Sequence, residues 1–141
     1  MNTVDEKALN FMNSELKKAQ IELSQKENGR EAVDFNITTN KGDSYQLFFK
    51  SIDAGTEKSI KISKQDLGDL SENLLIGLVL LIDSEAKVLY LFPSTVFLNP
   101  NSIFISNDVM LAQLSNWEIS VFSNAIPELS KYALENMVDK L

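Results

Sequence analysis

The sequence predicts a single α/β domain over residues 1–141, with a central mixed β-sheet flanked by N- and C-terminal helices. Apolar residues recur at helical spacing at both ends of the chain, and alternating apolar and polar residues follow the first helix. In the middle, Leu74 to Ile82 is apolar without alternation, which is typical of a strand buried on both faces of a sheet. A chain of 141 residues fits one domain and can bury roughly two-thirds of its unfolded surface.

The first helix is predicted to begin at a capping box, in which Thr3 and Glu6 each satisfy a backbone N–H of the other. Asn28-Gly29 is predicted to stop it, because glycine reaches the left-handed conformation without a Cβ clash. One apolar stripe lies between these signals and consists of Val4, Ala8, Leu9, Met12, Leu16, Ala19 and Leu23.

Turn signals divide the rest of the chain into short elements. Asn40 to Asp43 is predicted to form a hairpin turn, and Ser63 caps a short helical turn that ends near Leu70. A short helical segment is expected around residues 109–114. The last helix should begin near Ser123 or Asn124 and tolerate a proline in its first turn. Strands are predicted over residues 33–38, 45–52, 58–62, 74–82, 88–92, 103–105 and 117–122.

The chain contains no cysteine and no histidine. This composition excludes disulfides, thiolate nucleophiles and Cys-rich zinc sites, and it removes the commonest general base and metal ligand. Any chemistry must therefore use carboxylates, lysine, hydroxyls or backbone groups. We expect a cytoplasmic protein, because the absence of cysteine suits a reducing compartment and the first ten residues do not match a signal peptide.

The net charge is −7 and the pI is near 4.6. Proteins that hold nucleic acid through phosphate contacts usually present a basic face, so this charge disfavours a nucleic-acid partner and favours a protein partner. The longest apolar run, Leu74 to Ile82, is far shorter than the roughly 20 residues that span a bilayer. No membrane association is therefore expected.

Several short motifs carry a resemblance to a known family. An acid follows a hydrophobic residue on a strand in Ala32-Val33-Asp34-Phe35-Asn36-Ile37, and a lysine followed by serine ends Tyr45-Gln46-Leu47-Phe48-Phe49-Lys50-Ser51. With the later stretches, this order of elements resembles the PD-(D/E)xK nuclease superfamily, in particular its degenerate bacterial offshoots. The resemblance covers roughly residues 3–122 and implies a restriction-endonuclease-like core. The later stretches are Lys61-Ile62-Ser63, Leu74–Asp83, Leu91-Phe92-Pro93-Ser94 and Val96-Phe97.

In that family two carboxylates hold Mg²⁺, and the metal and a lysine activate the attacking water. Asp34 matches the first acid and the metal ligand, and Lys50 matches the lysine. The second acid would stand two residues before Lys50, where this chain has Phe48, and a phenyl ring does not ligate a hard cation. Gln46 shares that strand face and offers a neutral oxygen.

The missing acid could come from the first helix, where Glu6 and Glu15 are candidates. Without it, Asp34 and Lys50 are a remnant of a catalytic site, a strand-end ion pair or two solvated charges. No cofactor is expected in the degenerate case, and Mg²⁺ is expected if the site is active.

Two other features have a functional and a structural interpretation. Lys58, Lys61 and Lys64 could track a phosphate backbone, but lysines on an edge strand more often discourage edge-to-edge pairing. Trp117 could stack on a base, yet the alternation around it favours a core or half-buried position.

Three functions follow from these residues. The first is a non-catalytic nuclease-fold domain that acts by binding or protein interaction. The second is an active metal-dependent DNA or RNA phosphodiesterase with a displaced acidic ligand. The third is an acidic interaction or inhibitor domain for a basic partner, which the charge would steer.

Overall fold

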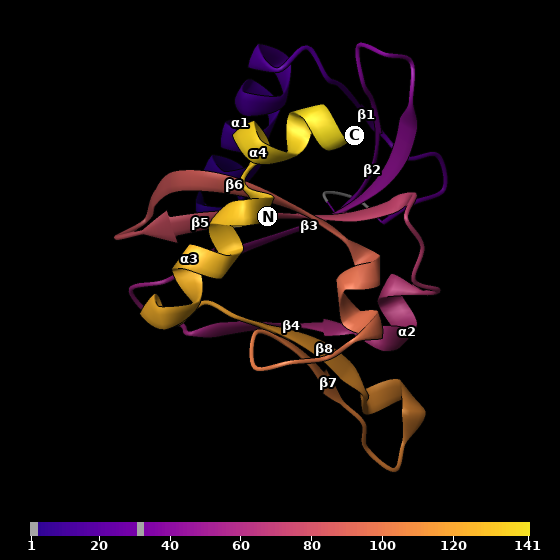
Figure 1. Ribbon diagram of the computed structural model, residues 1–141, viewed down its shortest axis with the longest axis vertical. Coiled ribbons are helices and arrows are strands. Elements are labelled where there is room, and N and C mark those ends of the chain that lie inside the picture. Colours follow the sequence, from indigo (N-terminus) through magenta and orange to yellow (C-terminus); the bar gives the residue numbers. More distant parts are fainter. Residues whose placement is uncertain (1–2, 31–32) are drawn as a thin grey trace.

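A mixed five-stranded sheet forms the centre of the fold in the computed structural model, which describes residues 3–30 and 33–141 (Figure 1). Its strand order is β1-β2-β3-β5-β6, and all neighbours are antiparallel except the central pair β3 and β5, which is parallel. The bounds are β1 Glu22–Gln25, β2 Asp34–Thr38, β3 Ser44–Asp53, β5 Leu74–Ile82 and β6 Glu85–Pro93.

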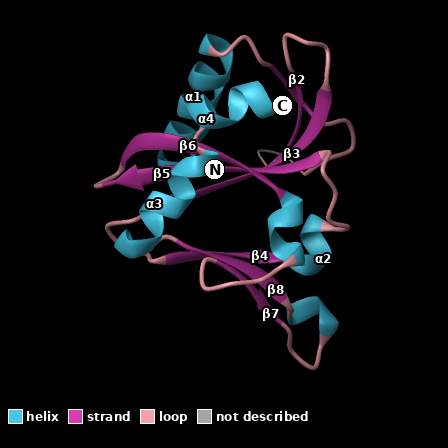
Figure 2. Cartoon of the chain, viewed as in Figure 1, coloured by secondary structure: helices cyan, strands magenta, loops and turns pink. Residues whose placement is uncertain are grey.

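A second, antiparallel sheet lies below the central one (Figure 2). It has the order β4-β8-β7. Although β4 comes between β3 and β5 in the chain, it belongs to this second sheet, and β3 pairs directly with β5. The short helix α2 (Lys64–Leu67) and the 3₁₀ turn Ser94–Leu98 lie beside it. The bounds of its strands are β4 Ser59–Ser63, β7 Phe104–Asn107 and β8 Asn116–Ser120.

The helix α1 (Thr3–Lys18) and the short helix α4 (Leu134–Met137) cover the face of the central sheet that points away from the second sheet (Figure 1). Another short helix, α3 (Ile126–Leu129), lies on the side of the second sheet, where Leu129 is buried. Between these helices run 3₁₀ turns, at Ser123–Ala125, Ser130–Tyr132 and Val138–Lys140.

Alternation along the strands divides the apolar residues into two cores, one on each face of the central sheet. The core under the helices contains Ala8, Met12, Leu16, Phe35, Leu47, Phe49, Leu75, Val79, Leu89, Leu91 and Met137. The core between the sheets contains Phe48, Ile52, Ile62, Ile76, Leu78, Leu80, Phe92, Phe97, Phe104, Ile119 and Leu129. Because β5 supplies residues to both, it is apolar throughout.

The structure confirms the mixed α/β class, the central mixed sheet and strands in each predicted stretch. It also confirms the hairpin turn after β2, the Ser63 cap, whose side chain accepts from the Asp66 N–H, and the proline in the first turn of α3. The second sheet is not predicted by the sequence. The side chain of Thr3, which is the predicted helix cap, lies outside the described part of the structure, and so does all of Ala32.

The prediction that the first helix continues to Leu23 is wrong. Helix α1 ends at Lys18 because Gln20 adopts a left-handed conformation, with φ of 60°. The N–H of Ile21 then donates to the carbonyl of Leu16 at 2.9 Å, which closes a Schellman-type cap. The stripe continues in the sequence because Leu23 belongs to β1, where it pairs with Ile37.

The prediction of one continuous C-terminal helix is also wrong. The chain is extended at Ala133, with φ of −59° and ψ of 145°, and this residue forms an isolated bridge with Tyr90 at the edge of β6. Leu129 packs in the core between the sheets, whereas Met137 packs under α1 on the other face. A straight helix cannot reach both cores, so the segment breaks where it crosses the sheet edge.

Among the helices in the described part of the chain, none has the length and apolarity needed to cross a membrane.

Candidate functional site

Asp34 is the first residue of β2, and both oxygens of its carboxylate accept hydrogen bonds from Arg30. The Nε of Arg30 donates to Oδ2 at 2.9 Å and its Nη2 donates to Oδ1 at 3.1 Å. The backbone N–H of Arg30 adds a third bond, to Oδ2 at 2.6 Å. This is the two-pronged geometry in which a guanidinium matches a carboxylate.

The loop before β2 is folded tightly around Asp34. The carbonyl of Asp34 accepts from the Lys26 N–H at 3.1 Å and from the Gln25 side-chain amide at 3.0 Å. A Cβ on Gly29 would lie 2.7 Å from the Cβ of Asp34, closer than real side chains approach. Gly29 is therefore required by this close approach, whereas the sequence suggested a helix stop.

The charge of Asp34 is set by opposing effects. Burial is the largest single influence and raises the pKa of the Asp34 carboxyl. The side-chain and backbone hydrogen bonds from Arg30, with its positive charge, together outweigh burial and hold this pKa below its ordinary value. The same contact raises the pKa of Arg30. The pair is therefore fully ionised at neutral pH.

Phe48 lies directly opposite Asp34 on β3 and is buried. The Arg30 guanidinium carbon lies 4.8 Å from the centre of its ring, and the Nζ of Lys50 lies 5.6 Å from it. Two cations thus flank one aromatic ring, a favourable arrangement because the ring face is electronegative. Arg30 also lies 3.7 Å from Asp66 of α2, through Nη1.

The structure places Asp34, Phe48 and Lys50 on the same sheet face, as the motif predicts, but gives Asp34 a different partner. Its ion pair is with Arg30, and Lys50 approaches the Phe48 ring. Gln46 is exposed and accepts a long hydrogen bond from Lys26 at 3.5 Å.

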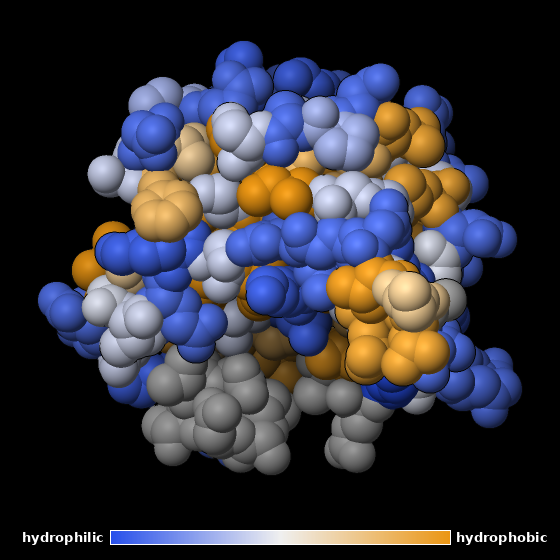
Figure 3. All heavy atoms as spheres, turned by 90° about the horizontal axis from the view of Figure 1, so that it is seen from below, coloured by the Kyte–Doolittle hydropathy of each residue, from blue (hydrophilic) through white to orange (hydrophobic). Residues whose placement is uncertain are grey.

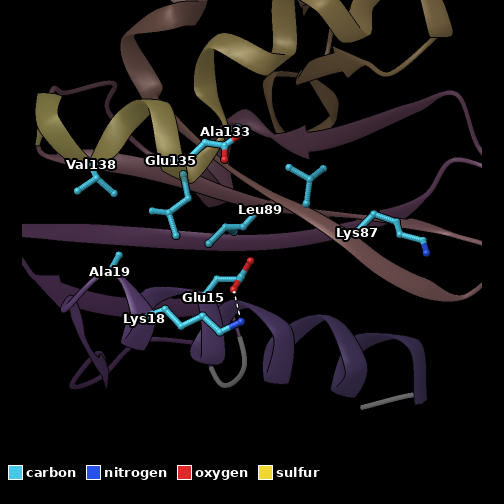
Figure 4. Close-up of a pocket in the computed structure, with 10 residues that line it drawn as sticks. Glu15, Lys18, Ala19, Lys87, Leu89, Ala133, Glu135 and Val138 are labelled. Carbon is cyan, nitrogen blue, oxygen red and sulfur yellow. Dashed lines mark ion pairs between the residues drawn. The ribbon is translucent and has the colours of Figure 1, made fainter.

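Glu6 and Glu15 lie on the opposite side of the central sheet. Both belong to α1, whose buried residues pack against the face that Phe48 does not reach. Glu6 is exposed. Glu15 forms an ion pair with Lys18 at 3.2 Å and lines a cavity of about 350 Å³ between α1, β6 and the C-terminal segment (Figure 4). The sheet therefore separates both acids from Asp34.

The residues at this position do not fit Mg²⁺. Both oxygens of Asp34 already accept hydrogen bonds from a cation, and the residue opposite is a buried phenyl ring. In residues 3–30 and 33–141, no group of three or more acidic, histidine or cysteine side chains has a geometry that could hold a metal ion.

The lysine run does not form a basic track. The Nζ of Lys58 donates to the carbonyl of Ala54 at 3.1 Å. Lys64 forms an ion pair with Asp108 at 2.5 Å and lies 4.0 Å from the centre of the Trp117 ring. Trp117 is half-buried and stacks on Phe97, with ring centres 4.8 Å apart, which agrees with the structural interpretation of this tryptophan.

Sequence reasoning missed two features. Arg30 is the chain's single arginine and lies four residues before Asp34, and these two facts were the available signal. The second is the loop between β7 and β8, where Met110 and its apolar neighbours are exposed. Its signal is the apolar run that follows Asp108, in the stretch where the sequence predicts a short helical segment and the structure has a 3₁₀ turn at Ala112–Leu114.

Comparisons of this chain with protein-family models, with curated proteins and with solved structures found no match.

Proposed function

We propose that this chain is a catalytically degenerate domain of the restriction-endonuclease-like fold that acts by binding a protein. The observation that carries the proposal is the Arg30–Asp34 ion pair. A carboxylate that is to ligate a metal must offer its oxygens to the cation, and here a guanidinium holds both.

The nuclease-like core is supported by the arrangement of the first elements. Helix α1 precedes an antiparallel pair, β2 and β3, and β3 lies parallel to β5 in the middle of the sheet. In the resemblance, Asp34 of β2 matches the acid and Lys50 of β3 matches the lysine. The fold departs from the arrangement that the resemblance implies in one respect, because β4 belongs to a second sheet.

A protein is favoured over nucleic acid as the partner because of the charges. The net charge is −7, and residues 88–130 contain no lysine or arginine. Lys64, which lies over the half-buried Trp117 ring, is already engaged because it pairs with Asp108. A phosphate backbone therefore meets few available cations.

Incubation with plasmid and single-stranded DNA, with Mg²⁺ or Mn²⁺, tests the proposal. We expect no cleavage and no retention of DNA at 100 mM salt by the wild type. Cleavage that is lost in both Asp34→Ala and Lys50→Ala, but kept in the surface control Lys61→Ala, would overturn the degenerate assignment. Salt-sensitive DNA retention without cleavage would replace the protein partner by nucleic acid.

A further inference from the structure

The two edges of the central sheet are not protected equally. At β6 the extended residue Ala133 forms a bridge with Tyr90 and covers part of the edge. At β1, on the opposite margin of the sheet (Figure 1), no strand of residues 3–30 or 33–141 pairs with the outer side. Neither a proline nor a bulge blunts this strand. An open strand edge presents unpaired N–H and C=O groups, and the partner that matches them is another extended backbone.

The hydrogen bonds of β1 identify which backbone groups are open. The Lys26 N–H donates to the carbonyl of the first residue of β2 at 3.1 Å. Because facing residues alternate in an antiparallel ladder, Ser24 and Glu22 also direct their backbone groups toward β2. Leu23 and Gln25 therefore direct their N–H and C=O groups outward, away from the sheet.

A second copy of this chain fits these outward groups in one antiparallel register. When Ser24 lies opposite Ser24 of the second copy, Leu23 lies opposite Gln25 on both sides of the twofold axis, and each such pair exchanges both N–H···O bonds. A register centred on Leu23 needs the N–H of Ile21, which already donates to a carbonyl of α1 at 2.9 Å. A register centred on Gln25 needs Glu27, which lies in the turn beyond β1.

The register centred on Ser24 is also complementary in charge. It places Glu22 opposite Lys26 of the second copy, and the twofold axis repeats this pair. Glu22 is exposed and takes part in none of the ion pairs among the described residues. The Nζ of Lys26 donates a long hydrogen bond of 3.5 Å to the Gln46 side chain. Opposite charges that face each other on paired strands favour the register that brings them together.

The surface between α1 and β1 is hollowed along the open edge. Two hollows of about 270 Å³ and 590 Å³ adjoin there, and Asn13, Leu23 and Ser24 line both. Leu23 packs against the core under the helices but is only partly buried. In the register centred on Ser24, the Leu23 side chains of the two copies lie diagonally across the strand pair, within reach of each other. Pairing of two copies would therefore bury Leu23 further.

We propose that this chain forms a symmetric dimer by antiparallel pairing of β1 with β1 of a second copy, centred on Ser24. The inference goes beyond the proposed function and does not depend on it. The other surface that could join two copies is the end of the β7–β8 hairpin, where Met110 is exposed and orange side chains gather in Figure 3. Apolar side chains there select no particular partner, whereas the open groups of β1 select an extended strand.

Sedimentation equilibrium of the full chain tests the dimer. Gln25→Pro removes the outward N–H and places the proline ring against the second strand, so it should remain a monomer. Gln25→Ala is the matched control, because it loses the same side-chain bond to the Asp34 carbonyl but keeps the N–H. We expect the wild type to dimerise at concentrations up to about 1 mM, since a small interface is weak, and Gln25→Ala to match it within about threefold. Met110→Ser should also match it.

Charge reversal tests the register. Glu22→Lys alone and Lys26→Glu alone each place like charges at both facing positions, so each should weaken the dimer by about tenfold. An equimolar mixture of the two variants should dimerise as well as the wild type, because every facing pair then joins opposite charges. This recovery does not occur if a variant fails to fold. A mixture that stays as weak as its components would overturn the register.

A cysteine at the twofold axis tests the pairing directly. Facing Cα atoms at Ser24 should lie about 4.5 Å apart, a distance that a disulfide can bridge. Under glutathione disulfide, Ser24→Cys should form a covalent dimer much faster than the exposed control Ser102→Cys, and the chain has no other cysteine. Equal rates, a monomeric wild type at every concentration, or a dimer lost in Met110→Ser would overturn the inference and leave the proposed function standing.

Discussion

Arg30 and Asp34 form a bidentate ion pair in which the aspartate is more buried than the arginine. The Asp34 side chain is 11% exposed and the Arg30 side chain 43%. The guanidinium bonds the carboxylate and also lies over the Phe48 ring, so one cation satisfies a nearly buried anion and covers an aromatic residue. Asp34 is thus part of the packing at the start of β2.

Removing Arg30 should destabilise the protein. In Arg30→Ala the carboxylate of Asp34 loses two side-chain hydrogen bonds and keeps the one from the backbone N–H of residue 30. The site is nearly dry, although solvent reaches part of it, so we expect a loss of about 1–2 kcal/mol in the free energy of unfolding. The exposed pair of Glu15 and Lys18 is the matched control, and Lys18→Ala should cost less than about 0.5 kcal/mol. Urea denaturation measures both, and equal costs would contradict the role of Arg30.

The pair should also make stability depend on pH. Because the folded protein holds the pKa of Asp34 below its ordinary value of about 3.9, the unfolded chain takes up the proton first on acidification. The contribution of Asp34 is therefore complete above about pH 5 and is lost as the pH falls through the folded-state pKa.

Denaturation of the wild type and Asp34→Asn between pH 2.5 and pH 7 checks this expectation. The difference in free energy of unfolding should be constant near neutral pH and should narrow below about pH 4. The carboxyl ¹³C shift of Asp34 should titrate at a pH below that of an exposed aspartate. If the difference in free energy of unfolding widened on acidification, the folded-state pKa of Asp34 would be raised and not lowered.

Replacing Phe48 by glutamate tests the resemblance to the PD-(D/E)xK nucleases, whose second acid would stand at this position. Phe48 is 4% exposed and packs between the sheets, so Phe48→Glu should destabilise by more than about 3 kcal/mol, whereas Phe48→Leu should cost less than about 1.5 kcal/mol. Thermal melts with and without Mg²⁺ compare the two. A Phe48→Glu protein that folds as well as the wild type and is stabilised by Mg²⁺ would instead support the active-nuclease interpretation.

The strands could be predicted because their signals are local. Alternation in β2 and β3 and the continuous apolarity of β5 each reflect which faces are buried, and Gly42, with φ of 89°, marks the hairpin turn. The end of α1 could not be predicted, because a glutamine, Gln20, adopts the left-handed conformation and the apolar stripe continues into β1. Neither a glycine nor a proline marks that position.

The longer-range features depend on contacts that a linear pattern does not contain. Nothing in the alternation of β4 says that it pairs with β8 and not with β3. The break at Ala133 follows from a bridge to Tyr90, 43 residues earlier in the chain. For the site, the parity of Asp34, Phe48 and Lys50 was predictable, but the side of the sheet that α1 covers was not. Glu6 and Glu15 do not reach Asp34 because α1 covers the opposite face of the sheet.

The contact of Lys64 with Trp117 should be visible by fluorescence, because Trp117 is the chain's single tryptophan. The ammonium lies 4.0 Å from the ring centre on one face, and Phe97 stacks on the ring at 4.8 Å. In Lys64→Ala the Lys64 side chain no longer covers the ring, and water reaches the indole. We therefore expect a red-shifted emission maximum and faster quenching by acrylamide.

Lys61→Ala is the matched control, since Lys61 is an exposed lysine of the neighbouring β4, and its spectrum should equal that of the wild type. Lys64→Met keeps most of the covering stem but loses the charge that pairs with Asp108, so it separates coverage from the ion pair. It should keep the wild-type emission maximum. If Lys64→Met shifts the spectrum as far as Lys64→Ala does, the ammonium and its pairing with Asp108, and not the stem, hold the hairpin base against the ring.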